Sequence, residues 1–94
     1  MYSEYLVNNR FYLKEKTNIE CAEYFEYTGN WSGNHECVII DDYIDIFSFV
    51  KNGFTFIHSG KHFIYWCDIS IFLKLHCKAK SEIRNEYLDK ILNR

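Results

Sequence analysis

The sequence contains no proline, only four glycines and no long uncharged apolar run, and each shortage excludes a class of protein. Without proline-rich, repetitive or low-complexity tracts there is no sign of a linker, so we expect one domain over residues 1–94. No apolar run approaches the length of a membrane span. The N-terminus lacks the basic start and apolar core of a signal peptide, so we expect a cytoplasmic protein.

The glycines do not form the spaced pattern of a phosphate-binding loop, and the four cysteines do not form the close pairs of a structural zinc site. In a reducing cytosol these cysteines are expected to stay free thiols. Three pairs have side chains of types that suit zinc: His35 with Cys37, His58 with His62, and His76 with Cys77. Because none has a specific ligand spacing, we expect no metal and no cofactor.

Signals for catalysis and for nucleic-acid binding are equally weak. Cys37 lies near His35 and Asp41, which supplies the residue types of a nucleophile, a base and an acid, but no nucleophile motif surrounds it. The last third of the chain is rich in lysine and arginine, yet acidic residues lie among them and the net charge of the whole chain is −2. We expect neither an enzyme nor a protein that binds nucleic acid directly.

Hydrophobic residues make up 48% of the chain and aromatic residues 19%, which is typical of a packed domain and not of disorder. The opening pattern predicts a short hairpin that turns at Asn8–Asn9. A capping box of Thr17 and Glu20 then predicts a helix, which Gly29 is placed to end. Residues 28–35 have the composition of a loop.

From Cys37 onward the apolar period changes to two, which predicts strands. We expect a short strand before a turn at Asp41–Asp42, and then two strands joined by a hairpin loop at Asn52–Gly53. Ser59–Gly60 predicts a second hairpin loop, which places Phe56 opposite Phe63 and Phe54 opposite Tyr65. In this register His58 and His62 fall on opposite faces of the sheet. In this register six aromatic side chains share the core side of a three-stranded meander: Phe47, Phe49, Phe54, Phe56, Phe63 and Tyr65.

Residues 63–77 carry an apolar side chain at every odd position. We interpret them as strand with a break near Asp68–Ser70, with a helix from Asp68 as the alternative. Ser81 is expected to cap a C-terminal helix with an apolar arc. The predicted fold class is α+β, in which a mainly antiparallel β-meander sheet packs against an N-terminal-half helix and a C-terminal helix.

Charge is distributed unevenly along the chain. Residues 1–50 contain three basic and nine acidic residues, whereas residues 51–94 contain eight basic and four acidic residues. From Glu15 to Asp45 there are eight acids and one base, with aromatic residues between them. Aromatic anchors surrounded by acids suit a basic protein surface. The predicted contact residues are Glu20, Glu23, Glu26, Tyr27, Trp31, Glu36, Asp41 and Asp42.

The sequence therefore favours a small protein-binding inhibitor that occludes the basic surface of a nuclease or another nucleic-acid-handling protein. Toxin-immunity proteins and phage anti-defence proteins act in this way as classes. The alternative is a self-associating structural or regulatory subunit, including a homodimer, that pairs through a sheet edge. The residues of that edge would be Ile69, Ile71, Leu73 and Leu75. A small metal-binding protein or enzyme is the weakest of the three interpretations.

Overall fold

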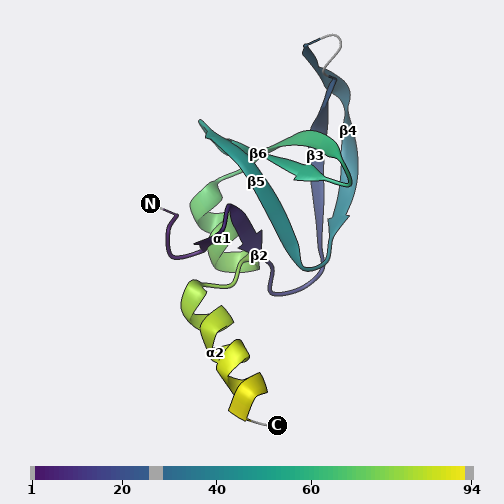
Figure 1. Ribbon diagram of the computed structural model, residues 1–94. Helices are drawn as coiled ribbons and strands as arrows, with labels where there is room; N and C mark the ends of the chain where they lie inside the picture. Colours follow the sequence, from purple (N-terminus) through teal and green to yellow (C-terminus); the bar gives the residue numbers. More distant parts are fainter. Residues whose placement is uncertain (1, 26–28, 93–94) are drawn as a thin grey trace.

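The structure is a computed structural model that describes residues 2–25 and 29–92, with only the backbone of 32–35 (Figure 1). Its described elements are β1 (Leu6–Val7), β2 (Arg10–Tyr12), β3 (Thr17–Phe25), β4 (Asn30–Ile40), β5 (Tyr43–Val50), β6 (Gly53–His58), β7 (Lys61–Trp66), α1 (Ile69–His76) and α2 (Lys80–Leu92). All strands pair antiparallel in one sheet, in the order β1-β2-β5-β6-β7-β3-β4. The predicted α+β class with a meander sheet is confirmed.

The sheet is strongly curled, because β4 and β5 are joined by a tight turn but are not neighbours in it. β4 is an edge strand, β5 is the third strand from the other edge, and only Asp41 and Asp42 connect them. The backbone N–H of Leu13 donates to the carbonyl oxygen of Asp42 at 2.8 Å, which ties this turn to the segment after β2. The intervening strands must therefore bend, and Figure 1 shows β3 and β4 rising steeply past β5 and β6.

The first hairpin forms as the sequence predicts. Leu6 pairs with Phe11 and Val7 with Arg10, which leaves Asn8 and Asn9 as a two-residue loop. Both asparagines have positive φ, at 51° and 61°. This is the conformation that such a loop requires, and asparagine tolerates it better than most residues.

The predicted helix from Thr17 is wrong, because this segment forms β3. The hydroxyl of Thr17 donates a hydrogen bond to the carbonyl oxygen of Glu15 at 3.0 Å and does not cap a helix. Thr17 and Ile19 are buried whereas Glu20 is exposed, which is the two-residue period of a strand. The loop expected over residues 28–35 is also corrected for its described part, since residues 30–35 belong to β4.

The hairpin between β5 and β6 turns one residue earlier than the sequence predicts. Lys51 and Asn52 form its loop, and Gly53 pairs with Val50 as the first residue of β6. Glycine is needed inside the strand at this position, because a Cβ there would collide with the carbonyl oxygen of Tyr65 on β7. The close approach of a third strand therefore requires glycine at this position.

A bulge at Phe47 changes which aromatic side chains reach the core. Phe49 pairs with Phe54 and Ile46 pairs with Phe56, so Phe47 has no partner in the ladder between β5 and β6. Phe47 and Phe49 were both expected in the core, but Phe47 is 67% exposed. Phe49 is 39% exposed and packs only at the margin of the core, against Tyr2 and Phe11. The pairs that depend on the second hairpin are confirmed: Phe56 with Phe63, and Phe54 with Tyr65.

The segment after β7 forms helix α1, so the helix alternative is correct and the strand interpretation is wrong. Asp68 caps the helix, and its Oδ1 accepts a hydrogen bond from the Ile71 N–H at 3.3 Å. Phe72 packs against Phe54 and Tyr65, with ring centroids 5.6 and 5.5 Å away. The odd-position stripe divides between the core (Ile69 and Leu73) and solvent (Ile71 and Leu75). It therefore cannot serve as a sheet edge.

The hydrophobic core lies inside the curl, between the concave face of the sheet and α1. Its buried members come from every strand except β1 and from α1: Phe11, Leu13, Ile19, Cys21, Val38, Ile40, Ile44, Phe54, Phe56, Phe63, Ile69, Phe72, Leu73 and Cys77. We call the opposite, convex side the outer face. It has no helix against it in the described part of the chain (Figure 1).

Helix α2 extends away from the sheet and buries none of its residues (Figure 1). The Lys80 N–H donates to the carbonyl oxygen of Glu4 at 2.7 Å, and Lys78 Nζ lies 3.0 Å from Glu86 Oε2. Ser81 was expected as the cap but lies inside the first turn, where the Glu82 carboxylate instead accepts the Ala79 N–H at 3.4 Å. Most of the predicted apolar arc is exposed: Tyr87, Leu88, Ile91 and Leu92.

Candidate functional site

Four ring side chains from four strands meet on the outer face, and we call them the outer aromatic cluster. Its members are Tyr24 on β3, Trp31 on β4, Phe47 on β5 and His62 on β7. Tyr24 and Trp31 are directly opposite in the ladder, with ring centroids 4.9 Å apart. The imidazole of His62 is central, with centroids 5.5 Å from Tyr24, 5.4 Å from Trp31 and 4.7 Å from Phe47. The cluster thus spans the width of the sheet from β4 to β5.

The cluster is packed enough to bury polar atoms yet still presents aromatic surface. Within the described residues, the Nε2 atom of His62 is buried and has no hydrogen-bond partner. Trp31 remains 38% exposed, and Phe47 is the most exposed ring of the four. Ile57, which pairs with His62 across the β6–β7 ladder, extends the exposed apolar surface. Contiguous exposed apolar surface of this kind is typical of a protein-binding site.

The predicted acidic residues of the β3–β4 hairpin lie on both of its faces. Glu20 is exposed and lies opposite Cys37, on the same face as Tyr24 and Trp31. Glu36 lies opposite the buried Cys21 and therefore points to the other face.

Glu23 is also on the concave side, where it pairs with Phe63 in the ladder. Its carboxylate lies 4.0 Å from Lys61 Nζ, and its side chain is only 14% exposed. The hairpin therefore carries carboxylates on both faces of the sheet. Glu26 and Tyr27, the other predicted contact residues of this hairpin, lie outside the described residues.

Asp41 and Asp42 lie at the opposite end of β4 from Trp31, in the turn to β5. Asp41 Oδ1 is 3.8 Å from Lys16 Nζ, and both side chains are largely exposed. With Asp45, Tyr43 and His58 they line a depression of about 270 Å³. The structure thus brings Trp31 and Glu20 to one face, and places Asp41 and Asp42 apart from them along β4.

Asp45 adds little free negative charge to that end of the sheet. Its Oδ1 accepts a hydrogen bond from Arg10 Nε at 2.8 Å, and the guanidinium carbon lies 3.7 Å from the centre of the Tyr43 ring. Arg10 is therefore held between a carboxylate and an aromatic face. The negative surface near the turn comes mainly from Asp41 and Asp42.

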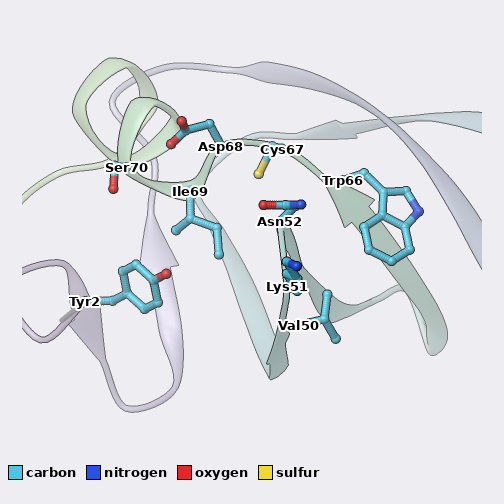
Figure 2. Close-up of a pocket in the computed structure, with 9 residues that line it drawn as sticks. All are labelled: Tyr2, Val50, Lys51, Asn52, Trp66, Cys67, Asp68, Ile69 and Ser70. Atoms are coloured by element: carbon cyan, nitrogen blue, oxygen red, sulfur yellow. The ribbon is translucent and has the colours of Figure 1, made fainter.

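A cleft of about 630 Å³ lies elsewhere, between the β5–β6 loop and the start of α1 (Figure 2). Figure 2 shows Tyr2 and Trp66 on opposite sides of it, with Cys67 and Asp68 along its upper wall. Burial raises the pKa of the Cys67 thiol to about 11, so at neutral pH it is protonated and a poor nucleophile. The Asp68 carboxylate caps α1. These two side chains therefore serve the fold and not an evident reaction.

The other cysteine and histidine side chains of the described residues do not form a reactive cluster either. Burial raises the pKa of Cys21 and of Cys77 to about 12, which makes them inert core thiols. His58 and His62 lie on opposite faces of the sheet, as their predicted register requires. Among the described side chains, those of residues 2–25, 29–31 and 36–92, no three of histidine, cysteine, aspartate or glutamate are grouped closely enough to hold a metal ion.

Comparisons of this chain with protein families, with curated proteins and with solved structures find no match in any of the three. Neither of the two helices in the described part is long and apolar enough to cross a membrane. The functional argument therefore depends on the geometry of the outer face and of the β3–β4 hairpin.

Sequence reasoning singled out Trp31 but missed the rings around it. Phe47 was assigned to the core, because the bulge that reverses its direction has no local sequence signature. The outward direction of His62 was available from the Ser59–Gly60 turn, which places it opposite Ile57. The pairing of Tyr24 with Trp31 was hidden by the helix predicted from Thr17 to Gly29 and by the loop predicted over residues 28–35.

Proposed function

We propose that this protein is a non-enzymatic inhibitor that binds a basic protein surface through the β3–β4 hairpin and the outer aromatic cluster. The partner is a nuclease or another protein that handles nucleic acid, and binding occludes its basic surface. The observation that carries the proposal is the position of Trp31 and Tyr24 on the same face as Glu20, in a hairpin without basic residues.

The aromatic side chains supply anchors for such an interface. Tryptophan and tyrosine dominate the binding energy of many protein interfaces, because they bury a large area with little loss of side-chain entropy. Trp31 is held against Tyr24 and His62, so its ring is already ordered before a partner arrives. A preordered ring lowers the entropic cost of association.

The charge distribution selects a basic partner. Residues 17–50 contain seven acidic residues and no lysine or arginine. Within the described residues, the ion pairs of these acids join Lys61 to Glu23 at 4.0 Å, Lys16 to Asp41 in the β4–β5 turn at 3.8 Å, and Arg10 to Asp45 at 2.8 Å. An excess of charge of one sign speeds association with an opposite surface, and strongly basic surfaces are characteristic of proteins that bind phosphate backbones.

The test is capture of the partner with matched charge variants. The wild-type protein, the Glu20→Lys/Glu36→Lys variant and the Trp31→Ala variant are immobilised and exposed to host lysate at low and moderate salt. A Glu4→Lys/Asp89→Lys variant has the same change in net charge outside the hairpin and serves as the control. We expect one stoichiometric basic protein on the wild type and on the control, and its loss from both hairpin variants and with rising salt.

The captured protein is then assayed for binding or cleavage of nucleic acid. We expect stoichiometric wild-type protein to abolish that activity and the Glu20→Lys/Glu36→Lys variant to leave it intact. Equal capture by the hairpin variant and the control would overturn the proposal, as would a captured partner whose activity on nucleic acid is unaffected.

A further inference from the structure

Strand β4 ends the sheet, and its outer edge has no paired strand in the described part of the chain. Its hydrogen-bonded neighbour is β3 alone. The register is one-to-one from the pair Thr17–Ile40 to the pair Ala22–His35, and then becomes irregular before Trp31. Residues 35–40 are therefore a regular edge of six residues, which is about 20 Å of unpaired backbone donors and acceptors.

This edge lacks lysine and proline, two residues that commonly block pairing. Proteins protect exposed edges with lysine, with proline, or by covering or shortening the strand. β4 contains neither lysine, arginine nor proline, and its 11 residues make it the longest strand described. Its irregularity lies at residues 32–34 and leaves the six-residue edge intact. An edge of this length is open to strand addition.

The charges around the edge determine which strand it accepts. Glu20 lies on the outer face beside Cys37, Glu36 lies on β4 itself, and Asp41 and Asp42 follow its last residue. Carboxylates thus flank both faces and one end of the edge. A second copy of this chain would bring its own Glu36 close to these acids, and like charges on paired strands are destabilising. A segment with lysine or arginine would place opposite charges there.

We propose that an extended basic segment of the partner adds to β4 as an eighth strand, antiparallel or parallel, along residues 35–40. This inference rests on the proposed function and specifies how the same hairpin binds. Main-chain hydrogen bonds to β4 supply affinity, while alternate side chains of the added strand lie beside the exposed Cys37 and Ile39 and near Glu20. Basic side chains of the segment pair with the surrounding carboxylates.

The probe is a synthetic nine-residue peptide of alternating lysine and valine. Its control has the same sequence with N-methyl groups on every second residue, which keeps the charge and the side chains but removes the amides of one edge. Binding is measured by fluorescence anisotropy, and amide hydrogen exchange is followed residue by residue. We expect the unmodified peptide to slow exchange of alternate amides in residues 35–40, and the N-methylated peptide to bind at least about tenfold more weakly.

The outcomes separate this inference from the proposed function. If both peptides bind equally and exchange in β4 does not change, strand addition is overturned, while loss of both peptides in Glu20→Lys/Glu36→Lys still supports an acidic binding surface. If neither peptide binds, strand addition of a basic segment is overturned and the capture experiment alone decides the function. Slow β4 exchange that depends on protein concentration without any peptide would assign the edge to a second copy and overturn the inference.

Discussion

Phe47 of β5 and His62 of β7 meet on the outer face with ring centroids 4.7 Å apart, although β6 lies between their strands. The bulge in β5 makes this contact possible. It turns Phe47 away from the core, while Ile46 and Phe49 on either side keep their core-side partners Phe56 and Phe54. The hydroxyls of Ser48 and Thr55, 2.6 Å apart, fill the adjoining ladder position with small side chains. The place of Phe47 in the outer aromatic cluster therefore depends on this bulge, whereas Tyr24, Trp31 and His62 contact one another without it.

The two phenylalanines Phe47 and Phe56, which the sequence alone assigns to the same core, are predicted to differ sharply in their effect on stability. Phe56 is fully buried and stacks on Phe63 with centroids 5.4 Å apart, so Phe56→Ala should lower the free energy of unfolding by about 3–5 kcal/mol. Phe47→Ala should lower it by less than about 1.5 kcal/mol, because most of its ring is already in solvent. Denaturant titrations of both variants measure the difference, and similar losses would contradict the outward position of Phe47.

The sequence predicts the meander well where turns decide it locally. Asn8–Asn9 and Ser59–Gly60 fix their hairpins through backbone conformations that these residues favour, with φ of 51° and 76° at Ser59 and Gly60. The pairs that follow from the second turn are confirmed down to the residue. The α+β class follows from these strands and from the C-terminal helix.

The failures arise where distant residues decide the outcome. Thr17 and Glu20 form a good capping pattern, but β3 has partners on both sides, and these ladders outweigh local helix propensity. The bulge at Phe47 is set in the ladder between β5 and β6, and the close approach of β7 that requires glycine at position 53 comes from residues distant in the sequence. The candidate site was predicted least well from the sequence, because its four rings come from four different strands. Only Trp31 of these four was predicted as a contact residue.

Gly53 is predicted to tolerate no side chain. The backbone of Tyr65 occupies the space of a Cβ at this position, so Gly53→Ala must separate β6 from β7 and should cost about 2–4 kcal/mol of stability. Gly60→Asn is the matched control. Gly60 has open space around it, and asparagine accepts its positive φ of 76°, so the loss there should stay below about 1 kcal/mol. Thermal unfolding of both variants tests the prediction, and an equally stable Gly53→Ala variant would refute it.

Helix α2 is predicted to contribute little to the stability of the sheet. It buries none of its residues, and its ion pair of Lys78 with Glu86 is exposed and worth at most about 1 kcal/mol. A chain that ends at residue 80 should therefore keep the unfolding midpoint of the remainder within a few degrees while losing helical circular dichroism. By contrast, Phe72→Ala in α1 should cost about 3–5 kcal/mol, because its ring packs on Phe54 and Tyr65. If the truncation lowered the free energy of unfolding as much as Phe72→Ala does, α2 would have to pack against the sheet.

The buried thiols are predicted to make the fold sensitive to alkali. Burial raises the pKa of Cys77 from its ordinary value of 9.0 to about 12. Because the unfolded chain releases this proton first, the contribution of Cys77 is complete below pH 9 and is lost progressively as the pH rises toward 12. The loss is at most about 1.4 kcal/mol per pH unit for one thiol. Cys21, whose pKa burial also raises to about 12, should add a similar dependence.

The comparison that isolates this effect uses slopes and not absolute stabilities, because Cys77→Ala also removes core volume. Between pH 9 and pH 11 the free energy of unfolding of Cys77→Ala should fall less steeply than that of the wild type, since one linked proton is gone. Cys37→Ala, at an exposed position, is the control for lysine and tyrosine groups that titrate in the same range and should follow the wild-type slope. Identical slopes for Cys77→Ala and Cys37→Ala would mean that the Cys77 thiol ionises as readily in the folded protein as in the unfolded chain, and its place in the core would then be wrong.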